Sequence, residues 1–306
     1  MQRYVVRRVL QGLVTLFLVS IIVFILGRLT GDPVALLLSE FSTFEDKERL
    51  TRQLGLDKPL PEQYAIFIWN ALRGDLGKSI RGDHSPALEL VLERLPATLQ
   101  LASISASLSF LIGLPLGVLA ALRRGTFVDS MSRILALLGQ ATPVFWLGIV
   151  AMYVFSVRLG LVPTSGYGTP KQFILPVAAL SAFMVAAFLR LTRSGMLEAL
   201  DSEYVKLARI KGLSEMTVVW KHALRNSLIP VITYLGTVFG RMVTGTVVVE
   251  TVFAWPGVGR LAYDAVMLRD YPVLQAVVLF MATTILVINL VVDILYAYID
   301  PRIRYS

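Results

Sequence analysis

The amino-acid sequence predicts an all-α, polytopic membrane protein with six transmembrane helices. Of its 306 residues, 56% are hydrophobic and only 16% are charged, whereas soluble domains are about half apolar and about a quarter charged. The mean hydropathy of +0.69 agrees with this class. Six apolar runs have about the length that crosses a bilayer core of roughly 30 Å. They cover residues 9–29, 99–122, 134–157, 173–191, 228–249 and 272–295.

The first run predicts an N-terminal transmembrane helix within residues 1–30. It follows Arg3, Arg7 and Arg8 and is too long for a cleaved signal peptide, and no small-residue cleavage motif follows it. Residues 31–98 are expected to form an extracytoplasmic cap segment with short helices at 44–54 and 61–72 and a third opening at 85–92. Residues 99–295 then form a five-helix core, which contains a cytoplasmic loop at 192–227. Residues 296–306 form a cytoplasmic tail.

Basic residues between the runs predict the orientation, because short cytoplasmic loops retain Lys and Arg. The loops before the first run, between the second and third, between the fourth and fifth, and after the sixth are rich in Arg and Lys, whereas the opposite short loops hold few. Both termini are therefore expected in the cytoplasm. Three prolines, Pro115, Pro143 and Pro176, fall within the runs, where we expect neighbouring helices to tolerate them.

Composition also excludes several functions. The chain has no Cys and two His, His84 and His222, so it offers no thiolate or histidine metal centre. It lacks the G-x-x-x-x-G-K-[ST] pattern of an ATP-hydrolysing subunit, and no catalytic constellation of side chains is visible. The net charge of +8 is explained by topology and does not require a nucleic-acid partner.

The most informative segment, residues 203–230, is basic and of helical character and lies between two apolar runs. Asp201 and Ser202 are candidate N-caps, Gly212 is expected to end a first helix, and Ser214 to cap a second. An idle loop would not need apolar residues at 207, 213, 216 and 218–220. The pattern predicts a helix–turn–helix surface that docks into a groove on a partner.

A second candidate site lies around the fifth run. Arg241 is an ionisable residue inside the membrane, which predicts either a place on a transport pathway or a structural ion pair. Trp255 is expected to anchor the following loop at the membrane interface. The pathway or gate candidates are Arg241, Thr244, Glu250, Trp255 and Arg260. Small residues four apart, such as Gly113 and Gly117, predict close helix packing.

These motifs together resemble the permease subunits of ATP-binding-cassette (ABC) importers, in particular the dipeptide/oligopeptide/nickel branch and its B-type subunit. The resemblance rests on Ala208-Arg-Ile-Lys-Gly212-Leu-Ser and His222-x-x-Arg225-Asn226-x-x-x-Pro230. It also rests on Gly31-Asp-Pro, Gly74-Asp-Leu-Gly77, Phe253-Ala-Trp-Pro-Gly-Val-Gly-Arg260, Arg269-Asp-Tyr-Pro and Asp300-Pro-Arg, and so covers nearly the whole chain. The general importer loop begins Glu-Ala-Ala, where this chain has Lys206-Leu-Ala208, so single contacts of that loop do not transfer.

The resemblance implies a type I ABC importer permease fold in a bacterial or archaeal inner or plasma membrane. It implies a C-type permease partner, two ABC ATPase subunits that bind ATP and Mg²⁺, and an extracytoplasmic substrate-binding protein. Di- or oligopeptides are the favoured substrates, with nickel complexes, glutathione and oligosaccharides as alternatives. A self-sufficient secondary transporter is the competing class, but it would need repeats or ion sites that the sequence does not show. The implied ATPase-coupling residues are Glu203, Ala208, Gly212, Leu213, Ser214, Met216, His222, Arg225 and Asn226.

Overall fold

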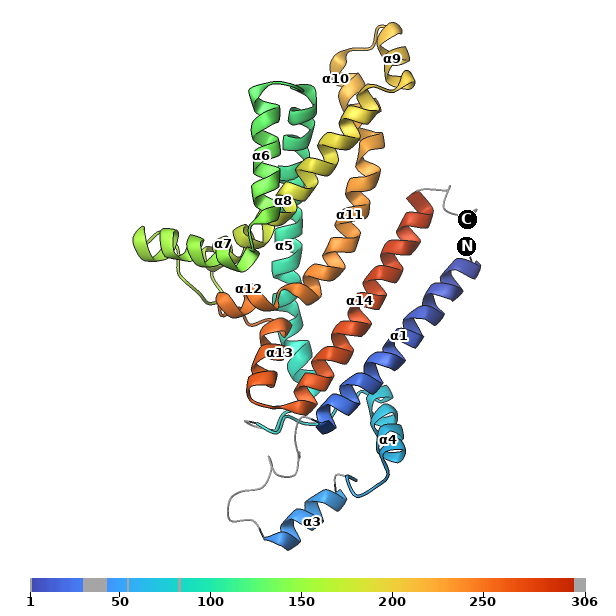
Figure 1. Cartoon of the computed structure of the whole chain (residues 1–306), viewed down its shortest axis with the longest axis vertical. Coiled ribbons are helices and arrows are strands. Elements are labelled where there is room, and N and C mark those ends of the chain that lie inside the picture. Colours follow the sequence, from blue (N-terminus) through green and yellow to red (C-terminus); the bar gives the residue numbers. More distant parts are fainter. Residues whose placement is uncertain (1, 30–42, 54, 82–83, 300–306) are drawn as a thin grey trace. The chain divides into compact units, whose positions relative to one another are not determined.

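The computed structural model describes residues 2–29, 43–53, 55–81 and 84–299, and these residues form helices and connecting turns (Figure 1). In these ranges the one β pairing is an isolated bridge between Lys78 and Pro86, so the all-α prediction is confirmed. The motifs Gly31-Asp-Pro and Asp300-Pro-Arg lie outside the described residues. The helices are α1 (Gln2–Leu29), α3 (Phe44–Gln53), α4 (Leu60–Leu72), α5 (Ala87–Leu122), α6 (Phe127–Ala141), α7 (Val144–Ala151), η1 (Met152–Arg158), α8 (Pro170–Leu200), α9 (Glu203–Ile210), α10 (Glu215–Thr217), η2 (Val218–Ala223), α11 (Leu224–Gly245), α12 (Val247–Val252), α13 (Val258–Met267) and α14 (Tyr271–Ile299).

Among the described residues, four helices are long and apolar enough to cross a membrane, namely α1, α5, α8 and α14. The helix α6 and the continuous helix α7–η1 together make a fifth candidate, bent by 100° at the break between them. The run expected at 228–249 corresponds to α11, which is not among these candidates. A polytopic helical fold is therefore confirmed, whereas the number of six spans is not reproduced by length and composition.

Three expected boundaries are wrong. The run 134–157 is not one helix, because α6 ends at Ala141 and the extended residues Thr142 and Pro143 follow it. Proline has no N–H to continue a helical ladder and disfavours helix in the residue before it, so Pro143 separates two helices instead of lying within one. The run expected at 228–249 is also divided between two helices, because α11 ends at Gly245 and α12 begins at Val247. The short helix expected at 85–92 is the beginning of the 36-residue α5. By contrast, α3 and α4 match the predictions 44–54 and 61–72 closely.

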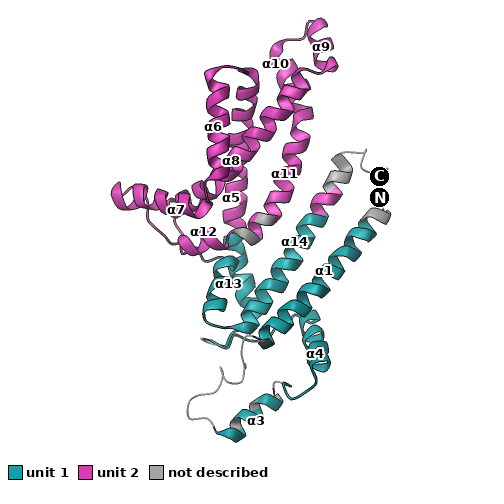
Figure 2. Ribbon diagram, viewed as in Figure 1, with its two compact units in different colours: residues 1–98, 256–290 teal, residues 99–255, 291–306 magenta. Residues whose placement is uncertain are grey.

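The chain divides into two compact units (Figure 2), of which unit 1 comprises residues 1–98 and 256–290. Its α1 and α4 are joined by a hydrogen bond between Ser20 Oγ and Tyr64 Oη at 2.8 Å and by packing of Phe24 on Tyr64. The buried carboxylate of Asp270 accepts hydrogen bonds from Ser79 Oγ and from the N–H of Ile80. This contact brings the Gly74-Asp-Leu-Gly77 and Arg269-Asp-Tyr-Pro segments together.

Unit 2 comprises residues 99–255 and 291–306 and is organised around α8. A Cβ atom at Gly113 of α5 would lie 2.7 Å from the Cβ of Phe188 and 2.9 Å from the carbonyl oxygen of Val185. At Gly117 it would lie 2.8 Å from the carbonyl oxygen of Leu189. Only glycine permits this approach, so the predicted role of both residues in close helix packing is confirmed.

Candidate docking surface

The segment that follows α8 folds as the sequence predicted, as a helix, a glycine turn and a second helix. The backbone of Ser202 precedes α9, although its hydroxyl donates to the carbonyl of Ala199 instead of capping the helix. Gly212 has a φ of +79°, a left-handed conformation that glycine adopts without a steric cost. Ser214 then caps α10, accepting a hydrogen bond from the N–H of Thr217 at 3.4 Å. The π-helical η2 continues directly into α11.

One side of this segment is anchored to the ends of α5 and α8. Val205, Ala208, Val218 and Ala223 are buried in a shared apolar cluster. Its other members include Val118, Ala121, Met196 and Ala199. Burial of apolar surface on this scale fixes the segment as a folded part of unit 2. The segment therefore does not behave as a solvated connector.

The other side exposes apolar residues. We define the tip patch as Leu207, Ile210, Leu213 and Met216, all of which are solvent-exposed, with Ile210 at 80% and Met216 at 70%. Charged pairs flank the tip patch. Arg209 donates two hydrogen bonds to Glu215, at 2.8 and 3.3 Å. Exposed apolar residues held on a rigid base are typical of a protein-docking surface.

The predicted coupling residues divide between these two sides. Leu213, Ser214 and Met216 are exposed, whereas Ala208 is buried and supports the segment from inside. Glu203 is also exposed and accepts a hydrogen bond from Lys206 at 2.7 Å, which raises the pKa of that ammonium group. Gly212 is exposed in the turn, and the other three lie on η2 and α11: His222 is half-buried, Arg225 and Asn226 are exposed, and the Asn226 amide donates to the carbonyl of His222.

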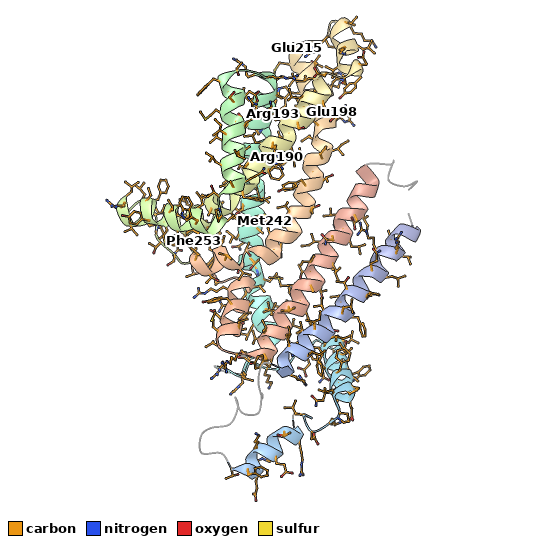
Figure 3. All side chains as sticks on the ribbon, in the orientation of Figure 1. Arg190, Arg193, Glu198, Glu215, Met242 and Phe253 are labelled. Carbon is orange, nitrogen blue, oxygen red and sulfur yellow. The ribbon has the colours of Figure 1, made fainter. Side chains whose placement is uncertain are left out.

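Sequence reasoning missed an ion pair close to this surface. Asp129, in the first turn of α6, is buried and accepts two hydrogen bonds from Arg193 of α8, at 2.6 and 3.0 Å. The N–H of Gly125 donates to the same carboxylate at 3.1 Å. Figure 3 labels Arg193 on α8, toward the end of unit 2 that carries Glu215. The two partners are 64 residues apart, and nothing local in the sequence indicates their contact.

A second ion pair joins the same region to the start of the docking segment. Arg124 lies 3.6 Å from Asp201, and both side chains are exposed. The α5–α6 turn and the first turn of α6 are therefore tied to the C-terminal part of α8 at two residues, to Asp201 through Arg124 and to Arg193 through Asp129.

The predicted gate residues are only partly placed. Arg241 and Thr244 belong to α11, but their side chains lie outside the described residues. Glu250 is fully buried and accepts a hydrogen bond from Thr246 Oγ1 at 2.7 Å. Arg260 lies in unit 1, half-buried and 3.8 Å from Asp264.

The expectation that Trp255 anchors at an exposed interface is wrong. Its side chain is fully buried. The indole packs edge-on against Tyr167 and Phe173, with ring centroids 4.9 and 4.6 Å away. The loop residues that follow α7–η1 and the beginning of α8 cover it, so Trp255 holds unit 2 together at this end.

Comparison with known proteins identifies the class. The fold is that of ABC importer permeases: an inward-facing structure of the MetNI methionine ABC transporter matches with a TM-score of 0.57 and 19% identity, covering 69% of this chain and 96% of that one. A crystal structure of an amino acid ABC transporter with histidines matches with a TM-score of 0.51 and 19% identity, covering 70% and 94%.

The chain belongs to the family described as binding-protein-dependent transport system inner membrane component, whose model matches residues 113–305. The N-terminal model of the same system matches residues 1–102. Relatives aligned over the full length of both chains include the glutathione transport system permease protein GsiC of Escherichia coli K12, at 42% identity, and a putative peptide transport system permease protein of Brucella abortus, at 40%. The chain is thus a multi-pass inner-membrane permease of a binding-protein-dependent ABC importer, as the motif resemblance predicted.

Proposed function

We propose that this permease imports di- or oligopeptides and that its tip patch docks onto an ATPase subunit, which hydrolyses ATP on its behalf. The observation that carries the docking proposal is the tip patch itself: four exposed apolar residues on α9, the following turn and α10, in a segment anchored to α5 and α8. Movement of such a rigid segment is passed directly to the helices that it joins. A related C-type permease would complete the pathway, and an extracytoplasmic binding protein would deliver the substrate.

The docking proposal is tested by a single charge in the tip patch. Ile210→Asp places a carboxylate at an apolar contact, so association with the ATPase should fall at least tenfold, about 1.4 kcal/mol, and uptake should fall with it. Leu72→Asp is the matched control, because Leu72 of α4 is 78% exposed and lies outside the segment. Equal ATPase association in the two variants would overturn the docking assignment.

The orientation proposed for this assignment places both termini and residues 203–225 in the cytoplasm. It is supported by the concentration of Arg and Lys in the loops on that side. On the opposite side lie residues 31–98, which we propose as the extracytoplasmic cap, and the 159–169 loop.

The peptide substrate is supported by the relatives, one named for glutathione and another for peptides. Glutathione is itself a tripeptide, so the chemistry shared by these substrates is a short zwitterionic peptide backbone. Cells that lack other peptide importers, supplied with this permease and its cognate partners, should take up a labelled dipeptide. Excess glutathione competes if the two share the pathway. Uptake of glutathione but no dipeptide would narrow the proposal to that substrate and refute the general peptide assignment.

We also propose that Arg241, Thr244 and Glu250 contribute to an outer gate. The proposal is supported by the buried carboxylate of Glu250, since ionisable groups inside a membrane protein are expensive and generally functional. Arg241→Ala should then change uptake per assembled complex while assembly stays intact, and Arg241→Lys should be milder. Poor assembly with normal uptake per complex would instead identify Arg241 as structural.

A further inference from the structure

The helix α7–η1 has no role in the function proposed above, and its direction within unit 2 is unusual. The N–H of Thr142 donates to the carbonyl of Leu138 and closes α6. Thr142 and Pro143 then adopt extended conformations, with ψ of 124° and 131°. The next helix begins at Val144 and continues through η1 to Arg158, at 100° to α6 (Figure 1).

The packing of α6 on α8 relates this angle to the plane of the membrane. A Cβ atom at Gly139 of α6 would lie 2.7 Å from the Cβ of Ala186, so α6 packs closely on α8. Because α8 is a long apolar helix of membrane-spanning type, a helix at 100° to its neighbour α6 runs close to the plane of the membrane. The helix α7–η1 has fifteen residues, which gives a length of about 22 Å along that plane.

One face of α7–η1 is packed inside unit 2. Gly148 is buried, and a Cβ atom there would lie 3.0 Å from the ring of Phe253 and 3.7 Å from the Cβ of Ala179. Leu147 and Ala151, on the same face, are half-buried. These contacts hold the helix against α8 and the end of α12.

The rest of its surface is apolar and exposed. No charged residue occurs between Val144 and Val157. The exposed side chains on this stretch are Phe145, Trp146, Ile149, Tyr153, Val154, Phe155 and Val157. Water does not favour an uncharged surface of this size, and Trp and Tyr side chains are enriched where acyl chains meet headgroups.

Polar groups gather at the far end of the helix. Arg158 Nε donates to Tyr153 Oη at 2.8 Å. Lys171, near the start of α8, lines an open hollow of about 360 Å³ together with Ser156, Gly160 and Thr164. Two cations beside an apolar helix match the negative charge of lipid phosphates.

We propose that α7–η1 is an interfacial helix. It lies in the membrane plane at the leaflet boundary nearest the 159–169 loop, with its exposed rings among the acyl chains and Arg158 and Lys171 among the headgroup phosphates. The partner of this surface is the lipid itself, so the third apolar run does not cross the bilayer as one helix. The helix then fixes the depth of α8 and α12 relative to that boundary.

The absence of Cys from the sequence makes the experiment direct. Nitroxide labels are attached to single cysteines replacing Phe145, Ile149 or Val157 in the assembled transporter, reconstituted in nanodiscs of phosphatidylethanolamine and phosphatidylglycerol. Collision rates with oxygen and with a water-soluble nickel chelate give the depth of each label. Leu137→Cys on α6 is the deep reference, and Ser165→Cys in the loop, outside the hollow, is the aqueous reference.

The proposal predicts one shallow depth for all three labels, between the two references. A depth that changes steadily by about 18 Å from position 145 to position 157 would show a spanning helix and overturn it. Low collision rates with both reagents would show that protein covers the surface, in place of lipid. Collision rates like those of the loop reference would show that the helix lies in water. Either of these last two results would also overturn the proposal.

Discussion

The buried pair of Asp129 and Arg193 gives the sharpest prediction of stability. The side chain of Asp129 is 3% exposed and that of Arg193 is 20% exposed. Arg193→Ala therefore leaves a buried carboxylate with one remaining donor, the N–H of Gly125. Losing two charge-assisted hydrogen bonds, with only the exposed Arg133 at 3.9 Å left as a counter-charge, should cost about 3 kcal/mol.

Removing the charge of Asp129, the other partner, should cost less stability. Asp129→Asn leaves the cation of Arg193, which water reaches more easily, and keeps one acceptor oxygen, so about 1–2 kcal/mol is expected. Arg193→Lys keeps the charge but loses the planar fork, at about 1 kcal/mol. Arg133→Ala is the matched control, because Arg133 is 58% exposed and 3.9 Å from the same carboxylate, and it should change stability by less than about 0.5 kcal/mol.

The assay heats the purified, fluorescently tagged transporter to a series of temperatures. Size-exclusion chromatography then measures the fraction that remains folded at each temperature. At roughly 2–4 °C per kcal/mol, Arg193→Ala should lower the midpoint by about 6–12 °C, more than Asp129→Asn does. If Arg193→Ala and Arg133→Ala shift the midpoint equally, the bidentate pair contributes nothing and the reasoning from burial is refuted.

Three further predictions concern the turn, the helix packing and the topology. Gly212→Val should reduce uptake without preventing membrane insertion, because the φ of +79° disfavours a β-branched residue. Gly212→Asn should retain uptake, and equal uptake in both variants would refute a role for the turn. Gly117→Leu should lower the amount of assembled transporter on an immunoblot, since its Cβ would meet the α8 backbone, while Gly12→Ala, with an ordinary contact at 3.5 Å, should not; equal amounts of both would contradict the close approach. A reporter that is active only in the cytoplasm should work when fused after Leu213 and fail after Gly168, and the opposite pattern would reverse the proposed orientation.

Local rules predicted much of the fold and part of the site. The turn at Gly212, the cap at Ser214 and the close approach at Gly113 each depend on the conformation or size of one residue, which the sequence displays directly. Apolar runs likewise located most of the long helices. In these cases the physical cause lies within a few residues of the effect.

Features that depend on tertiary contacts were not predictable. The break in the apolar run 134–157 could not be predicted from hydropathy, because hydropathy is continuous across Thr142 and Pro143 while the backbone direction changes there. Trp255 appeared interfacial from its loop composition, yet Tyr167 enters from a distant loop and buries it. The pairing of Asp129 with Arg193 likewise depends on how α6 packs on α8.

The central claim, that the tip patch contacts an ATPase subunit, is tested most directly by photocrosslinking in the membrane. A benzophenone amino acid replaces Met216 in the tip patch or, as the control, the equally accessible Leu72 in α4. Our account predicts a light-dependent adduct between position 216 and the ATPase subunit, identified by mass spectrometry, and none from position 72. Transport-competent complexes that give no ATPase adduct from position 216, or the same adduct from position 72, would contradict it.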